Sequence, residues 1–261
     1  MRPFLFLLHP RFQVKSKRGR RWERYSIITE KNPREIVLLR GSGCKWKKCT
    51  FCDYHLDSSV SWEENFRLNS KVLSKVTGTY GSLEVINSGS FCELDEQTMD
   101  MIEDICLKNK IKLLHFESHL MYRNKAINAK KYFAENGITL KIKTGVETFD
   151  VDFREKVMKK GFGKATPEQI AEYADEVCLL FGLSGQNEEG MINDIETGLK
   201  YFERVCVNIM NENSTDIKPD ADVIKCFADK VAPLYIDSSR IDILMDNLSF
   251  GVGTKVQEGI K

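Results

Sequence analysis

Six short apolar segments recur along the chain, and each ends in polar or glycine-containing residues. They are four to six residues long and rich in Val, Ile, Leu and Phe, which is typical of strands buried in a parallel sheet. The segments span residues 35–40, 82–86, 112–116, 139–143, 177–181 and 205–209. The pattern therefore predicts six parallel strands.

Amphipathic segments lie between and after these strands. Thr166, Pro167 and Gln169 form an N-terminal capping signal, and Gly137 and Gly161 are C-terminal stop signals. The apolar spacing in the same segments follows the helical period. The helices that this predicts span residues 95–108, 124–136, 152–160, 166–175, 188–202 and 220–230.

Strands that alternate with helices predict an α/β fold with right-handed crossovers. A partial (β/α)6 TIM-like barrel fits residues 36–215, and an open doubly wound sheet is the alternative. We expect a basic N-terminal segment over residues 1–35 and the barrel with a C-terminal extension over residues 36–261. In both architectures ligands bind at the carboxyl ends of the strands. The polar candidates there are Asn87, Ser88, Gly89, Glu117, Ser118, Glu147, Ser184, Asn208 and Asn211.

Composition narrows the class of protein. The 261-residue chain is 42% hydrophobic, enough for a sizeable core, and its net charge of +1 argues against a general nucleic-acid binder. The apolar run Phe4–Leu8 is far shorter than the roughly 20 residues of a membrane span. We therefore expect a cytoplasmic protein. Basic residues crowd between Lys15 and Arg24, either as a solvated arm or as an RNA contact.

Three of the eight cysteines lie within nine residues, directly after the first predicted strand. Cys44, Cys49 and Cys52 have the spacing Cys-x4-Cys-x2-Cys, and in a reduced compartment such a cluster indicates metal or redox chemistry. The single cysteines within apolar patterns are expected to be core residues, namely Cys106, Cys178 and Cys206.

Four interpretations of the three cysteines compete. Zinc would take His55 as a fourth ligand, and a two-iron cluster would need a distant cysteine such as Cys92. A four-iron cluster held by three cysteines would leave one iron open to a small ligand, and the fourth interpretation is no metal. Because the loop lies at the ligand-binding end of a barrel that can enclose a ligand, the context favours the four-iron cluster.

The cysteine motif and the strand ends together resemble the radical S-adenosylmethionine (SAM) superfamily. Its usual spacing is Cys-x3-Cys-x2-Cys, so the longer first gap here is a departure found in some branches. The segment 87–90, Asn-Ser-Gly-Ser, matches a degenerate form of the glycine-rich motif that binds the methionine end of SAM. The resemblance implies a [4Fe-4S] cluster on the three cysteines, and these SAM-binding residues: Phe51, Ser88, Gly89, Glu117, Glu147, Lys160 and Ser184.

Residues 43–54, 145–148 and 160–162 resemble a narrower branch that contains the radical subunit of archaeosine synthase and queuine lyase. The branch implies a 5′-deoxyadenosyl radical that acts on a 7-deazaguanine. The short chain, without an added RNA-binding domain, favours C–N cleavage of free queuine to release preQ1. A 7-deazaguanine in tRNA is the alternative substrate, and a zinc- or iron-sulfur-bearing binding module is the non-enzyme alternative.

The resemblance also directs attention to substrate and partner contacts. A carboxylate is suited to the N1–H and exocyclic amine of a deazaguanine, and amides are suited to the diol hydroxyls. The candidate substrate residues are Asp53, Tyr54, Glu93, His119, Asn208 and Asn211. Each of these side chains has a structural alternative in loop formation, helix capping or packing. The implied partners are queuine and a reductant such as flavodoxin or ferredoxin, with no membrane and no nucleic acid; a homodimer stays open.

Overall fold

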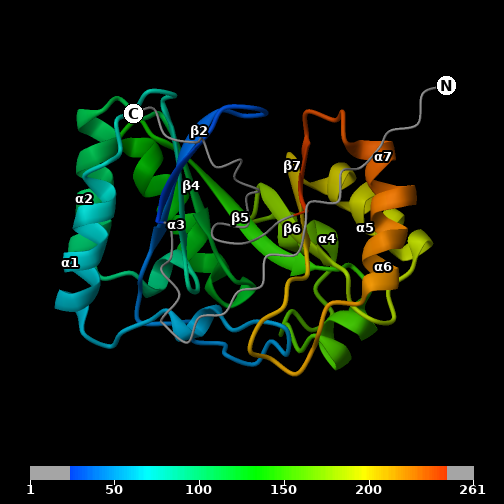
Figure 1. Ribbon diagram of the computed structural model, residues 1–261. Coiled ribbons are helices and arrows are strands. Elements are labelled where there is room, and N and C mark those ends of the chain that lie inside the picture. Colours follow the sequence, from blue (N-terminus) through cyan, green and yellow to red (C-terminus); the bar gives the residue numbers. More distant parts are fainter. Residues whose placement is uncertain (1–23, 246–261) are drawn as a thin grey trace, which may run out of the picture.

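A curled, mostly parallel sheet organises the computed structural model, which describes residues 24–245 (Figure 1). Its strands lie side by side in chain order, and only the pairing of the first two is antiparallel. They are β1 (Tyr25–Ile28), β2 (Arg34–Leu39), β3 (Ser82–Asn87), β4 (Leu113–Glu117), β5 (Thr139–Glu147), β6 (Glu176–Phe181), β7 (Arg204–Ile209) and β8 (Ile241–Leu244). The partial-barrel prediction is confirmed.

The six predicted strands are β2 to β7, and the sequence pattern missed the two edge strands. β1 is partly exposed and pairs only with β2, so it lacks a continuous apolar run. It falls within the predicted basic segment of residues 1–35, whose residues 1–23, including most of the Lys15–Arg24 run, lie outside the described residues. β8 is four residues long and contains Asp242, which interrupts its apolar character.

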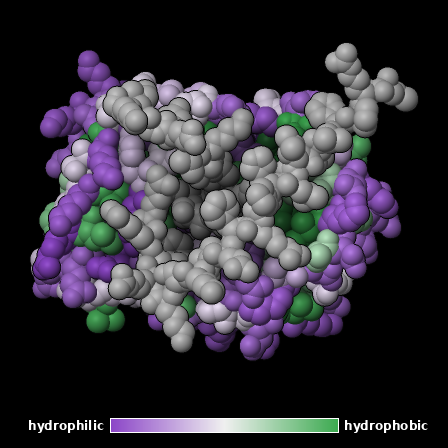
Figure 2. All heavy atoms as spheres, in the orientation of Figure 1, coloured by the Kyte–Doolittle hydropathy of each residue, from purple (hydrophilic) through white to green (hydrophobic). Residues whose placement is uncertain are grey.

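Helices cover the outer, convex face of the sheet, with α1 and α2 at one edge and α6 and α7 at the other (Figure 1). Figure 2 shows hydrophilic side chains over these outer helices. The longer helices are α1 (Trp62–Leu73), α2 (Glu96–Lys108), α3 (Arg123–Glu135) and α5 (Glu188–Tyr201). The shorter ones are α4 (Pro167–Ala171), α6 (Ala221–Cys226), α7 (Ala232–Tyr235), the π-helical η4 (Phe153–Val157) and η5 (Phe227–Val231), and the single turns η1 (Tyr54–Leu56), η2 (Phe91–Glu93) and η3 (Leu120–Tyr122).

The main apolar core lies between the sheet and the helices. Val37 and Leu39 of β2, Leu83 and Val85 of β3 and Phe116 of β4 belong to one buried cluster that continues around the sheet. Because side chains alternate across a strand, the residues between them point to the concave face. α1 was not predicted; Ser61 caps it by accepting a hydrogen bond from the backbone N–H of Glu64.

Charged side chains fill the part of the concave face nearer the amino ends of the strands. Glu84 of β3 pairs with both Arg34 of β2 and Lys143 of β5. Burial by itself would raise the pKa of the Glu84 carboxyl, but the two cations hold that pKa well below its ordinary value. Arg34 also lies 3.7 Å from Asp242 of β8, so side chains link the two edges of the open sheet. Among residues 24–245, no helix is long and apolar enough to cross a membrane.

The charged layer yields a stability prediction. Replacing Lys143 by Met should lower the free energy of unfolding by about 3 kcal/mol, because the buried Glu84 carboxylate loses one of its two cations. Urea denaturation at neutral pH measures the change. Lys141→Met on the same strand is the matched control, and it should cost less than about 1 kcal/mol because its ion pairs lie nearer the surface. Equal losses in the two variants would contradict the role given to the layer.

Candidate functional site

A cavity of about 1660 Å³ occupies the concave side of the sheet, and its wall reaches from Lys31 and Tyr80, before β2 and β3, to the cysteines after β2. It brings together most residues that the sequence predicted for the site. Those in its wall are Cys44, Cys49, Phe51, Cys52, Asp53, Tyr54, Ser88, Gly89, Glu117, His119, Glu147, Lys160, Asn208 and Asn211. Of the predicted site residues, Glu93 and Ser184 are outside the wall.

Glu93 fastens the cysteine loop, residues 41–60, to the two connections that follow β3 and β4. Its Oε1 accepts hydrogen bonds from the backbone N–H of Lys45 at 2.7 Å and the hydroxyl of Tyr122 at 3.1 Å. Its Oε2 accepts one from the backbone N–H of Ser90 at 2.6 Å. A Cβ on Gly89 would lie 1.8 Å from Oε2, so only glycine fits there. These contacts give Glu93 a structural role instead of the substrate contact suggested by the sequence.

A second set of contacts fastens the same loop to the segment after η4. The indole N–H of Trp46 donates to the carbonyl of Lys159 at 2.8 Å, and the backbone N–H of Thr50 donates to the carbonyl of Met158 at 3.1 Å. Gly161, at φ +79°, lies against the indole ring, where a Cβ would approach to 2.1 Å. The cysteine loop is therefore held from two sides.

His119 is part of this support. Its ring stacks on Trp46 with 5.6 Å between the centroids, and its Nδ1 accepts the backbone N–H of Met121 at 3.1 Å. That contact puts the ring proton on Nε2, which donates to the carbonyl of Lys160 at 2.8 Å. Burial, aided by the Lys160 charge, lowers the pKa of His119 to about 4, so the ring is neutral at pH 7. With both nitrogens occupied, His119 positions Lys160.

Glu147 and Lys160 form an ion pair in the cavity wall. β5 carries a bulge between Gly145 and Glu147, and Glu147 has φ +70°. The bulge directs Glu147 Oε1 to within 2.7 Å of Lys160 Nζ, and a Cβ on Gly145 would lie 2.4 Å from that oxygen. Burial alone would lower the pKa of Lys160, but Glu147 leads the opposing charges that raise it. Phe51 covers the pair, with its ring centroid 5.7 Å from Nζ.

The wall also contains Glu117, which the sequence analysis assigned to SAM binding, and two cysteines that it did not assign to the site. Glu117 accepts no side-chain hydrogen bond from residues 24–245, and burial raises the pKa of its carboxyl to about 7 despite the nearby Lys143 ammonium. Cys178 and Cys206 are register partners on β6 and β7, and both line the cavity. Cys178 is buried as expected and Cys206 is partly buried, but both face the cavity and neither belongs to the main apolar cluster under the helices, because alternate residues of both strands point inward. Each cysteine lies two residues after a charged residue, Glu176 or Arg204, and therefore shares its face of the strand. This spacing was the signal in the sequence that could have placed both cysteines in the cavity wall.

The loop after β7, residues 210–220, closes one side of the mouth and lies beside the cysteine loop (Figure 1). Asp53 Oδ2 accepts hydrogen bonds from the backbone N–H and the hydroxyl of Ser214, at 3.0 and 2.9 Å. Ser184 lies away from the cavity and donates to the carboxylate of Asp220. The other predicted substrate residues in the wall are Tyr54, Asn208 and Asn211.

The cysteine loop fits a four-iron cluster better than its alternatives. All three thiols face one cavity, whereas His55 and Cys92, the fourth ligands of the zinc and two-iron hypotheses, are outside its wall. A four-iron cluster attaches each thiolate to a different iron, so its three ligands must border one shared space.

Comparison with solved structures finds proteins of similar fold, two of which are described here. The fold is similar to the queuine lyase from Clostridium spiroforme bound to SAM and queuine, with a TM-score of 0.84 and 43% sequence identity, covering 90% of this chain and all of that one. It also resembles Streptococcus suis SuiB bound to the precursor peptide SuiA, with a TM-score of 0.51, 15% identity and coverage of 80% of this chain and 48% of that one, a likeness of fold alone. No protein-family profile and no curated protein matches the chain.

The support of the cysteine loop yields a prediction. Gly161→Ala should reduce the free energy of unfolding by about 3 kcal/mol or more, because the methyl group overlaps the Trp46 ring. Gly163→Ala is the matched control: φ is also positive there, at +57°, but no atom lies within 4 Å of a Cβ. It should cost only the roughly 1–2 kcal/mol of backbone strain. Chemical denaturation compares the variants, and a smaller loss for Gly161→Ala would contradict the assigned contact.

Proposed function

This chain belongs to the queuine lyase family of radical SAM enzymes, and on that premise we propose that it releases preQ1 from free queuine by breaking a C–N bond. The observation that carries the proposal is the placement of three thiols and the Glu147–Lys160 pair around one cavity. Its volume of about 1660 Å³ exceeds the roughly 300–1,000 Å³ of most single-ligand pockets. A cofactor and a substrate therefore have room to lie side by side.

Cys44, Cys49 and Cys52 would hold the [4Fe-4S] cluster and leave one iron for SAM. When bound, the cluster and SAM supply a 5′-deoxyadenosyl radical, which removes a hydrogen atom from an unactivated C–H bond. The protein contributes orientation and the exclusion of water. An apolar cluster packed against Cys49 and Cys52 supports that role: Phe51, Met158, Leu180, Leu183 and Met210.

SAM would lie along the wall between β3 and β5. Glu147 has a carboxylate suited to the ribose hydroxyls, and Lys160 holds that carboxylate in place. Phe51 offers a ring for adenine, and Ser88 and Gly89, which also line the cavity, would contact the methionine end. Ser184 is not part of the proposal because it lies outside the wall.

The substrate would be recognised by polar groups of the remaining wall. Of the acids nearest the mouth, Asp53 and Glu93 already accept hydrogen bonds from the protein, whereas Glu117 faces the cavity with an open carboxylate. We therefore assign Glu117 to an N–H group of a bound ligand, either the methionine amine or the deazaguanine. Asn208 and Asn211 have amides suited to the diol hydroxyls.

The direct test uses anaerobically reconstituted protein with SAM, a chemical reductant and queuine. We expect about four irons per chain, and formation of both 5′-deoxyadenosine and preQ1, followed by chromatography with mass detection. Alanine at Cys44, Cys49 or Cys52 should abolish turnover, and the far-UV circular dichroism spectrum should stay unchanged because the main core lies between the sheet and the helices. One zinc per chain and no product would refute the proposal. Turnover of queuosine in tRNA, but not of free queuine, would favour the tRNA alternative.

The ribose role of Glu147 has its own test. Glu147→Gln should weaken SAM binding by about 1–3 kcal/mol, because it removes the charge from the hydrogen-bond acceptor. Isothermal titration calorimetry on reconstituted protein gives the dissociation constant. Glu203→Gln, the same substitution at an exposed residue remote from the cavity, should leave SAM binding unchanged. Equal affinities in the two variants would remove Glu147 from the SAM site.

A further inference from the structure

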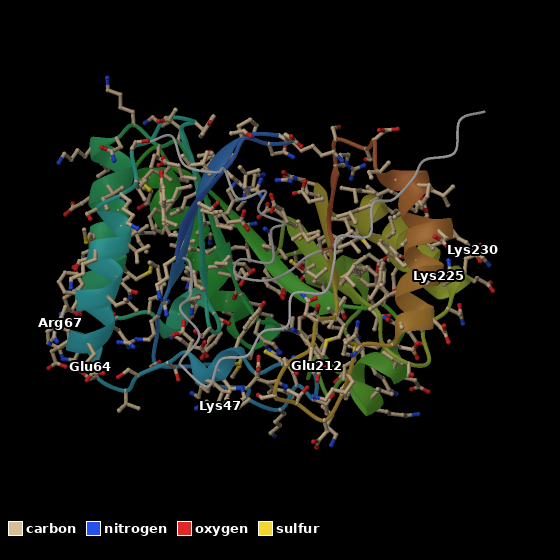
Figure 3. All side chains as sticks on the ribbon, viewed as in Figure 1. Lys47, Glu64, Arg67, Glu212, Lys225 and Lys230 are labelled. Carbon is tan, nitrogen blue, oxygen red and sulfur yellow. The ribbon has the colours of Figure 1, made fainter. Side chains whose placement is uncertain are left out.

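The cysteine loop has two chemically different faces. Cys44, Cys49 and Cys52 line the cavity, whereas the three lysines between Cys44 and Cys49 do not. Those lysines are Lys45, Lys47 and Lys48, and all three are exposed. Figure 3 shows Lys47 at the edge of the molecule, on the loop beneath the sheet. A single layer of backbone therefore separates the thiols from a basic outer surface.

Two further exposed lysines adjoin this surface. Lys159 is tied to the loop because its carbonyl accepts the indole N–H of Trp46, and Lys48 Nζ lies 4.8 Å from the centroid of that ring. Lys125 Nζ lies 5.7 Å from the ring of Tyr122, whose hydroxyl shares the Glu93 carboxylate with the cysteine loop. The outer lysine face consists of Lys45, Lys47, Lys48, Lys125 and Lys159.

The positive charge of this face is not neutralised locally. None of its five lysines forms an ion pair with a residue in the described range 24–245. Three acids on the adjoining segments are paired with bases outside the face, and Asp53 of the cysteine loop accepts hydrogen bonds from Ser214. The three ion pairs are Asp152–Lys156 at 2.9 Å, Glu155–Arg154 at 3.1 Å and Glu212–Lys218 at 2.8 Å. The face therefore presents concentrated charge that suits an acidic partner.

The proposed function supplies a reason for an acidic partner at this place. The reaction needs one electron from outside for the cluster, and the thiols that would hold the cluster lie directly behind the lysines. We propose that the outer lysine face docks a small electron-transfer protein whose cofactor is surrounded by acidic residues. The carrier gives up one electron, the cluster takes it up, and no bond forms or breaks. RNA is the less suitable occupant, because these lysines point away from the cavity where a base would enter.

The test is a charge reversal on the full-length, reconstituted protein. In the triple variant Lys47→Glu, Lys48→Glu, Lys125→Glu, the dissociation constant for a reduced flavodoxin of low isoelectric point should rise about tenfold or more at low salt. The rate of cluster reduction by that flavodoxin, measured by anaerobic stopped-flow absorbance, should fall in parallel. SAM binding and dithionite-driven formation of 5′-deoxyadenosine should stay unchanged.

A matched control reverses the same amount of charge elsewhere. Lys71, Lys75 and Lys108 are exposed and lie near the C-terminal ends of α1 and α2, and their triple change to Glu should leave flavodoxin binding unaltered. Equal binding by both triple variants and the unmodified protein would overturn the docking proposal. Loss of tRNA binding in the triple variant of the outer lysine face, with flavodoxin binding unchanged, would also overturn the proposal. Failure of the proposed function would give a different result: the unmodified protein would form no 5′-deoxyadenosine even with dithionite, which needs no docking surface.

Discussion

The three hydrogen bonds of the Glu93 carboxylate hold the site together. They join the connections after β2, β3 and β4 at one point, through Lys45, Ser90 and Tyr122. Without them, the cysteine loop would lose its anchor on that side of the cavity, and the thiols would no longer share a wall with the SAM-binding residues. Gly89 is required beside the carboxylate because no side chain fits there. A buried acid with no proposed contact to a ligand thus determines where the cluster would be placed.

The cavity exists because the sheet is curled and its concave face is polar. Outer residues such as Leu83 and Phe116 pack under the helices, while the inner residues Glu84 and Lys143 pair across strands within the cavity wall. The space between this charged layer and the cysteine loop is the part that the proposed ligands would occupy. The cysteine loop covers one end of this space, with thiols toward the cavity and lysines toward solvent. One short segment can in this way serve both cluster binding and contact with a reductant.

The sequence predicted the central strands well because each is a run of apolar residues bounded by polar ones. It also predicted the cysteine loop and most of the cavity wall, since the strand ends of such a fold meet at one edge. It could not show which polar side chains already have hydrogen-bond partners within the protein. Glu93 and His119 looked like substrate ligands, but their hydrogen-bonding atoms are occupied by partners far along the chain. Cys178 and Cys206 looked like core residues because a run of apolar neighbours hides which face each one occupies.

The central claim is that three cysteines hold a four-iron cluster whose remaining iron binds SAM in this cavity. Mössbauer spectroscopy on anaerobically reconstituted protein, enriched in the Mössbauer-active iron isotope, tests it directly. With three cysteine ligands, about one quarter of the iron should change its isomer shift and quadrupole splitting when SAM is added. The remaining iron should keep its parameters. A spectrum that SAM leaves unchanged, or that changes for all of the iron equally, would contradict the account.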